Sequence, residues 1–242
     1  MKLLSINSDA KTIKGLKAGF LTGVMYMAPA NLSGHNVCPQ ASAGCKTACL
    51  GWYAGRANII KRGNDTNTIR DSRLEKTKLY FDDRATFMNL LVKEIKALVR
   101  KAKREGLTPV VRLNGSSDIA FERVTWGLND FSIMDMFPDV QFYDYTKVTK
   151  RALAYAKGNM PKNYHVTFSA TEDNGDACAD VLLNGGNVAM VFDKVPATHM
   201  GYTVIDGDET DLRFNDKAGV IVGLKAKGDA KNDKSGFVRR AA

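Results

Sequence analysis

The sequence predicts an α/β fold in which short strands and helices alternate, arranged as a complete or partial TIM-like barrel of about seven βα units. Two observations lead to this prediction. Nearly all-apolar runs of strand length recur between stretches with helical periodicity, and each run is followed by polar side chains. The chain has 242 residues, and such barrels commonly use about 250 residues as one domain.

The first half of the chain contains a predicted amphipathic helix between two predicted strands. A strand is expected at residues 20–28, followed by a cysteine-rich loop, and the basic stretch 51–73 is expected to form loop and short helix. Apolar residues repeat at helical spacing over 85–104, with lysines and arginines largely on the opposite side, which predicts an amphipathic helix. Gly106 ends this helix, and 108–113 is predicted as the next strand.

The alternation continues through the second half. Helices are expected at 133–137, 149–157 and 177–183, and strands at 140–143, 164–169, 187–192, 203–205 and 219–224. Short, nearly all-apolar strands in this order are typical of a parallel sheet that is covered on both faces. Because no break in composition divides the chain, residues 1–242 are predicted to form one domain.

Charge gives a weaker indication of partners. Lys and Arg number 35 against 26 Asp and Glu, a net charge of +9, and the excess lies at 56–78, 93–104 and in a basic C-terminal tail at 225–240. Such a charge attracts nucleic acid, but a basic helix face is also typical of a solvated surface, so nucleic-acid contact stays open. The proportions, 44% apolar and 25% charged, exclude a mainly disordered or fibrous protein.

The apolar segments predict no membrane partner. The longest stretch without a charged residue, 18–44, is interrupted by several glycines and a proline. The N-terminus alternates lysines with short apolar pieces and has no pattern of a secretory signal peptide. We therefore expect a cytoplasmic protein.

Three of the four cysteines lie in one short loop at 36–50. Cys38, Cys45 and Cys49 follow a C-x6-C-x3-C spacing among small residues. Gly44 can take a positive φ angle before the second thiol, and Cys45 and Cys49 share a face if a helical turn follows. In a cytosolic chain such clustered thiols indicate metal ligands or redox groups rather than disulfides, and nearby Lys46 would offset thiolate charge.

The ligand count favours an iron–sulfur cluster. Three thiolates suit a [4Fe–4S] cluster with one iron left open, or a [3Fe–4S] cluster. Zinc is the alternative, because His35 with the three cysteines forms a Cys3His set, and unligated reduced thiols are the third. The remote Cys178 is read as a small core residue or as a fourth cluster ligand.

Polar residues after the expected strands are the other site candidates. Carboxyl ends of parallel strands share one edge, where ligands bind, and the cysteine loop leaves the first strand there. Near the cluster, Asn114, Ser116 and Asp118 are suited to binding a cofactor or substrate. Asp144, Lys147 and Glu172 are the candidates for proton transfer or charge pairing.

These residues resemble the radical S-adenosylmethionine superfamily, in which a three-cysteine loop follows the first strand of a partial barrel. The resemblance implies a [4Fe–4S] cluster on Cys38, Cys45 and Cys49, S-adenosylmethionine as a cofactor, and cofactor contact by the turn at 114–118. It also implies a redox or radical enzyme. The spacing here differs from the superfamily's C-x3-C-x2-C, and Ala48 replaces its aromatic residue.

A narrower resemblance covers most of the chain. The segments 38–50, 110–118 (VVRLNGSSD) and 142–147 (FYDYTK) resemble small phage-encoded proteins described as uncharacterised or as radical-SAM-like. This resemblance implies a location in the host cytoplasm. The second reading, of another class, is a zinc-stabilised module that binds nucleic acid.

Overall fold

The structure, a computed structural model, describes the whole chain except residues 8–9, 53–56, 58–66, 128–129 and 241–242. Its centre is a 10-stranded sheet. The strands lie in the order β1 (Leu4–Ile6), β2 (Phe20–Met25), β3 (Thr108–Arg112), β4 (Gln141–Thr146), β5 (Tyr164–Ser169), β6 (Val188–Phe192), β9 (Ile221–Lys225), β8 (Tyr202–Asp206) and β7 (Thr198–His199), with β10 (Val238–Arg239) beside β6.

Most of the sheet is parallel. Every neighbouring pair from β2 to β8 in this order is parallel, and β10 also runs parallel to β6, whereas β1 and β7 are antiparallel to their neighbours. In the described part of the chain the two outermost strands, β1 and β7, do not pair with each other, so the sheet is open. The predicted α/β class with a mostly parallel sheet is confirmed, but a closed barrel is not seen.

Apolar periodicity located the central elements well. The helix α4 (Arg84–Glu105) covers the predicted range, begins at the Asp83 cap and ends at Gly106, whose φ of 67° is left-handed. The helices α5 (Ile133–Met136), α6 (Thr149–Ala156) and α7 (Gly175–Leu183) lie within two residues of their predicted ranges. The strands β3, β5 and β6 agree similarly.

Several elements were not predicted from the sequence. The helix α3 (Thr68–Asp82) buries Arg70, Lys76, Thr77 and Tyr80, so its inward face is not apolar. Most of the stretch 51–73, which we expected to be loop and short helix, lies outside the described residues, and α3 begins at its end. The short β1, β7 and β10 and the helix α1 (Ala10–Lys17) were not predicted either.

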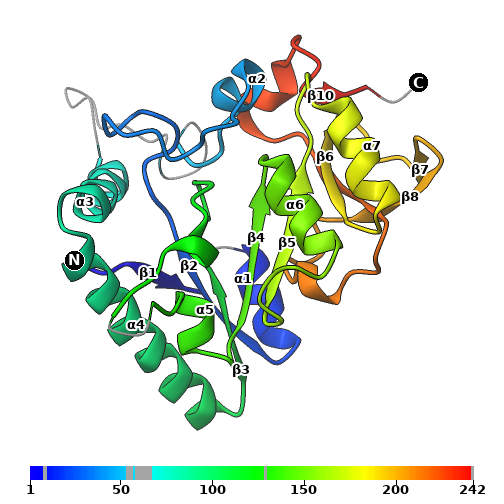
Figure 1. Cartoon of the computed structure of the whole chain (residues 1–242). Coiled ribbons are helices and arrows are strands. Elements are labelled where there is room, and N and C mark those ends of the chain that lie inside the picture. Colours follow the sequence, from blue (N-terminus) through cyan, green and yellow to red (C-terminus); the bar gives the residue numbers. More distant parts are fainter. Residues whose placement is uncertain (8–9, 53–56, 58–66, 128–129, 241–242) are drawn as a thin grey trace.

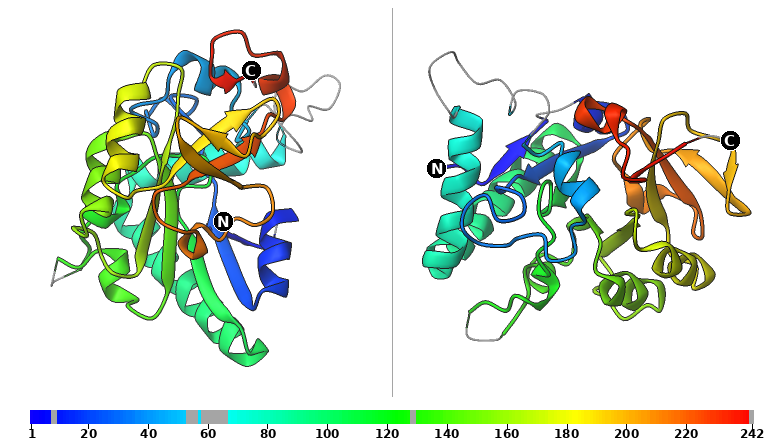
Figure 2. Two further views of the ribbon diagram at one scale, coloured as in Figure 1. Left: turned by 90° about the vertical axis from the view of Figure 1, so that its right-hand side faces the viewer. Right: turned by 90° about the horizontal axis from the view of Figure 1, so that it is seen from above.

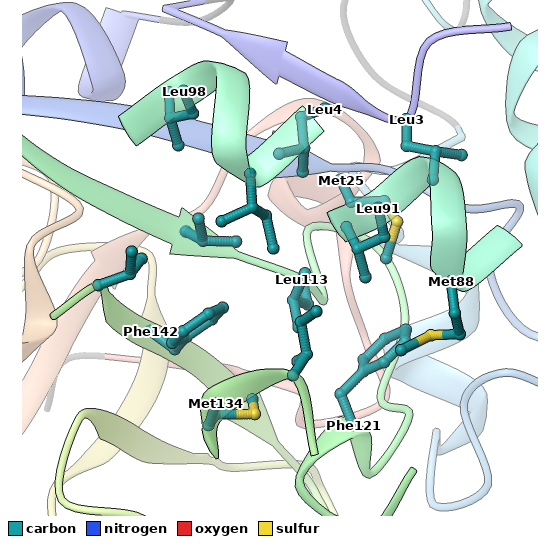
Figure 3. Packing of buried hydrophobic residues seen from close by; sticks show 14 of the residues in the cluster. Leu3, Leu4, Met25, Met88, Leu91, Leu98, Leu113, Phe121, Met134 and Phe142 are labelled. Carbon is teal, nitrogen blue, oxygen red and sulfur yellow. The ribbon is translucent and has the colours of Figure 1, made fainter. Parts of the chain in front are cut away.

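Helices cover one face of the sheet. Buried side chains of α4 (Met88, Leu91, Leu98) pack against Met25, Leu113 and Phe142 in the main core, as Figure 3 shows. A second core lies between α6, α7 and the strands β5, β6 and β9. In Figure 2 the view from above shows these helices outside the curved sheet. Within the described residues, no helix combines the length and apolar character that crossing a bilayer requires.

The opposite face carries a buried polar network. A segment that includes the short turn η3 (Arg213–Asn215) lies against it. The Asp211 carboxylate accepts hydrogen bonds from Arg112 Nη1 (2.8 Å) and from the Tyr143 hydroxyl (2.9 Å). Burial opposes the charge on Asp211, but Arg112, Lys11, the Tyr143 hydroxyl and Arg213 together outweigh burial and lower the pKa of Asp211.

The buried His165 on β5 belongs to the same face. Its Nδ1 lies 2.6 Å from the Tyr155 hydroxyl and its Nε2 lies 3.3 Å from Thr167 Oγ1. Burial, with a smaller effect from Arg213, lowers the pKa of His165 to about 4. We therefore assign His165 a structural role.

We predict that His165 stays neutral until the pH falls to about 4. Because an unfolded histidine has a pKa of about 6.5, the unfolded chain binds this proton first. The stabilisation from neutral His165 is therefore complete above about pH 6.5 and is lost as the pH falls towards 4. An NMR titration of the three histidines measures this, and a midpoint near 6.5 for His165 would contradict it.

Candidate functional site

The cysteine loop lies over the carboxyl ends of the central strands. It follows β2, contains the short helix α2 (Ala43–Thr47), and sits in Figure 1 above the ends of β4 and β5 and beside the C-terminal segment. The Asp118 N–H donates to Val37 O (2.7 Å), which ties the loop to the turn after β3. The loop and the strand-end residues therefore share one edge of the sheet, as the parallel topology predicted.

Cys38 is fixed by backbone groups from two segments. The Ala30 N–H donates to its Sγ (3.4 Å), and the thiol lies 3.8 Å from the carbonyl oxygen of Ser116. Burial raises the pKa of the Cys38 thiol to about 11. Without a metal, Cys38 is a neutral thiol at pH 7.

Cys45 and Cys49 come from α2 and the turn after it. The Ser42 hydroxyl accepts a hydrogen bond from the Cys45 N–H (3.1 Å) and so caps α2. Burial raises the pKa of Cys49, although a hydrogen bond from the backbone of Gly51 opposes this rise. Cys49 interacts electrostatically with both Cys38 and Cys45.

Lys147 interacts with all three thiols of the loop. It follows β4, hydrogen-bonds to Cys45 and interacts electrostatically with Cys38 and Cys49. Its ammonium also donates to Ser169 Oγ (3.2 Å). Burial opposes the charged form, but Cys45 and Asp118 outweigh burial and raise the pKa of Lys147. The structure thus brings Lys147 to the predicted ligands.

A second cation, Arg73 on α3, was missed from the sequence. It interacts electrostatically with Cys49, and its guanidinium lies 5.0 Å from the centre of the Tyr26 ring. Its Nη1 is buried without a hydrogen-bond partner in the described part of the chain. Lys46, which we expected to offset thiolate charge, is instead exposed. No sequence signal distinguishes Arg73 from its many basic neighbours.

Glu172 fastens the cysteine loop to the end of β5. Its carboxylate accepts hydrogen bonds from the Ser42 hydroxyl (2.7 Å) and from the Gly44 N–H (2.7 Å). Both oxygens are therefore used at the start of α2, where the helix dipole also favours a negative charge. In this structure Glu172 positions the loop, and its role in proton transfer stays a prediction.

Asn114 and Asp144 form a buried support below the thiols. The Asp144 carboxylate accepts from the Asn114 N–H (2.7 Å), the Asn114 amide (3.0 Å) and the Tyr164 hydroxyl (3.0 Å). Burial raises the pKa of Asp144 to about 6, against the effect of these donors. The Asn114 side chain also accepts from Ser117 Oγ and from the Ile119 N–H. Its side chain is thus occupied in shaping the turn.

Ser116 and Asp118 are likewise occupied by contacts within the protein. The Ser116 hydroxyl donates to Met27 O (2.6 Å). The Asp118 carboxylate accepts from Arg151 Nη1 (2.5 Å), Thr146 Oγ1 (2.8 Å) and the Lys147 N–H (2.7 Å). Both residues lie beside Cys38 and hold neighbouring segments in place, and their contact with a cofactor stays a prediction.

The C-terminal segment packs onto the cysteine loop. A Cβ at Gly44 would lie 2.8 Å from Phe237 Cβ, 2.9 Å from Glu172 Oε2 and against Ser235 Oγ. Gly44 is helical and is not among the residues with a positive φ, so close packing, rather than the expected backbone conformation, requires glycine here. Part of the predicted basic tail is therefore a cover for α2.

The other two candidate ligands point elsewhere. The His35 ring stacks on Phe81 (4.1 Å between ring centres), and its Nε2 lies 4.0 Å from Asp82 Oδ1. Cys178 is buried in the core between α7 and the sheet, where its Sγ lies 3.4 Å from Asn174 Oδ1. In the ranges that the structure describes, no three histidine, cysteine or acidic side chains already converge as ligands of one metal ion.

Fold and site together define an α/β protein with an open, mostly parallel sheet and a loop with three free cysteines over its carboxyl edge. The chain belongs to the Gene product 88 family (GP88), a phage-encoded family whose model matches residues 2–241. No curated protein and no solved structure matches it.

We predict that Gly44→Ala loosens the cysteine loop. The added methyl group must displace Phe237 or Glu172, which costs about 1–3 kcal/mol in the free energy of unfolding. Hydrogen exchange should then increase in residues 36–50 and 233–239 together. The matched control is Gly175→Ala, where a Cβ meets nothing within 4 Å. Equal exchange in the two variants would contradict the predicted packing.

Proposed function

We propose that the protein binds an iron–sulfur cluster through Cys38, Cys45 and Cys49. The observation that carries this proposal is that Lys147, at the ligand-binding edge of a parallel sheet, interacts electrostatically with all three thiols of the loop. All four cysteines are free, so none is used in a disulfide bond. We infer that the protein works in the reducing cytoplasm of the host cell, where these thiols stay available.

The arrangement favours a cluster over a single ion. A zinc ion needs four ligands at about 2.0–2.3 Å from one point, and the His35 ring is instead held against Phe81. A cluster distributes its thiolates over separate irons, so the sulfurs can lie further apart.

Charge around the thiols also suits a cluster. Three thiolates and inorganic sulfide accumulate negative charge, which is costly to bury without compensation. Lys147 and Arg73 both interact with these sulfurs, and within the described chain neither forms an ion pair with a carboxylate at 4 Å or less. The buried Nη1 of Arg73 that lacks a partner would gain an acceptor from an anionic group at this place.

The cluster would leave room for a small molecule. With three protein ligands, a [4Fe–4S] cluster supplies one iron with an open coordination position, whereas a [3Fe–4S] cluster needs no further ligand. We take the open sheet as a partial barrel of the radical-SAM type, with S-adenosylmethionine as the candidate small molecule. Lys147 and Ser169 would then orient polar groups of that molecule beside the thiols.

Anaerobic reconstitution with iron and sulfide tests the cluster. We expect the native protein to become brown, to retain iron and sulfide, and to give the electron paramagnetic resonance signal of a cluster after reduction or oxidation. Serine replacements of Cys38, Cys45 and Cys49 should each lower the retained iron several-fold. Cys178→Ala is the matched control and should retain the cluster, because Cys178 is remote from the loop.

Two results would overturn the proposal that the protein binds an iron–sulfur cluster. One is a colourless protein with stoichiometric zinc, and the other is equal iron retention in all four cysteine variants. Circular dichroism of each variant without metal shows whether the fold is intact, so a loss of cluster is not confused with unfolding.

A second prediction concerns Lys147. Lys147→Met keeps the length of the side chain but removes the charge that the three thiols share, so cluster affinity should fall about 10- to 100-fold. The matched control is Lys157→Met, because Lys157 is exposed. Competition with an iron chelator measures the cluster affinity. Equal affinities in the two variants would contradict a role for this charge.

A further inference from the structure

A cavity of about 340 Å³ lies next to the cysteine loop and is used by nothing described above. Four segments contribute to its wall: residues 36, 37 and 39 of the loop, residues 80, 81 and 84 at the junction of α3 and α4, residues 118–120 and 123, and residues 148, 150 and 151 at the start of α6. Its volume is at the lower end of the 300–1,000 Å³ range of small-molecule pockets. The cavity is therefore large enough for a ligand with one ring system.

Three positive charges of this wall are free. Arg84, Arg123 and Lys150 are exposed, and no carboxylate in the described residues forms an ion pair with any of them. A fourth cation, Arg151, is already neutralised, because it pairs with Asp118 (2.5 Å) and with Glu122 (2.8 Å). The available charge in the cavity is therefore positive, which favours an anionic ligand.

The start of α6 adds a further site for an anion. The N-cap residue Val148 lines the cavity and offers no side-chain acceptor to the first turn of this eight-residue helix. The first-turn residue Lys150 also lines the cavity. Free N–H groups and the positive end of the helix dipole suit a phosphate, and Arg84 and Arg123 line the same cavity.

Most of the remaining wall is apolar and partly aromatic. It is formed by Val37, Pro39, Tyr80, Phe81, Ile119 and Ala120, together with Asn36 and the carboxylate of Asp118, which is paired with Arg151. The Arg84 guanidinium lies 4.2 Å from the centre of the Tyr80 ring, so one cation borders the aromatic surface. Such a wall buries a flat organic body while the charges hold an anionic end.

We propose that this cavity binds a nucleoside monophosphate, with the phosphate at the start of α6 and the flat base against the apolar wall. One phosphate and one base match the volume and the three free cations better than a dinucleotide does. The site is separate from the cluster, because Cys38 does not line it and its thiol instead contacts Ala30 and Ser116.

Isothermal titration calorimetry with the four nucleoside monophosphates tests the proposal. We expect at least one monophosphate to bind. Its nucleoside and inorganic phosphate should each bind more weakly by about tenfold or more, because each lacks half of the contacts. Arg123→Gln and Lys150→Gln should each weaken binding about tenfold. The control Lys103→Gln removes an exposed charge of α4 outside the cavity and should not change the affinity.

Three results would overturn the proposal. Inorganic phosphate that binds as tightly as the monophosphates would show an anion site without the base. A single-stranded oligonucleotide that binds more tightly, with the same sensitivity to Arg123→Gln, would show a nucleic-acid surface instead. Equal affinities in all variants would remove the site. Binding by metal-free Cys45→Ser protein distinguishes this test from the cluster, since the cavity does not need that thiol.

Discussion

The contact between Glu172 and the start of α2 is the constraint on which the thiol site depends. A loop of small and polar residues has little apolar surface of its own, so its conformation must be fixed from outside. One carboxylate accepts hydrogen bonds from both the Ser42 hydroxyl and the Gly44 N–H. This brings Cys45 to the edge of the sheet where Lys147 follows β4. Close packing of Phe237 on Gly44 closes the same loop from above.

The strand-end residues that the sequence singled out act mainly on one another. Asn114 and Asp144 are almost fully buried, and burial of a charge is costly unless donors surround it. Here the donors come from Asn114 and Tyr164, and they offset part of the cost of burying the carboxylate. The turn after β3 is consequently rigid, and its backbone carbonyl at Ser116 can present a fixed neighbour to Cys38.

Sequence reasoning located what apolar periodicity and parallel topology determine. The helix α4 and the strands β3 and β5 followed from side-chain patterns, and the meeting of Lys147 with the cysteine loop followed from the shared carboxyl edge. Contacts between distant segments were not predictable in this way. Nothing local shows that the C-terminal segment covers α2, that His35 stacks on Phe81, or that Arg73 faces Cys49, because each depends on how α3 and the tail dock.

Asp118 connects the two sides of the cysteine loop. Its N–H donates to Val37, one carboxylate oxygen accepts from Arg151 in the cavity wall, and the other accepts from the N–H of Lys147 beside the thiols. A single buried carboxylate therefore balances a cation on the cavity side and positions one on the thiol side. Asp118 is only about 9% exposed, so solvent screens its charge weakly. A movement of Arg151 therefore changes the electric field at Lys147. The cavity wall and the cysteine loop are in this way linked through Asp118.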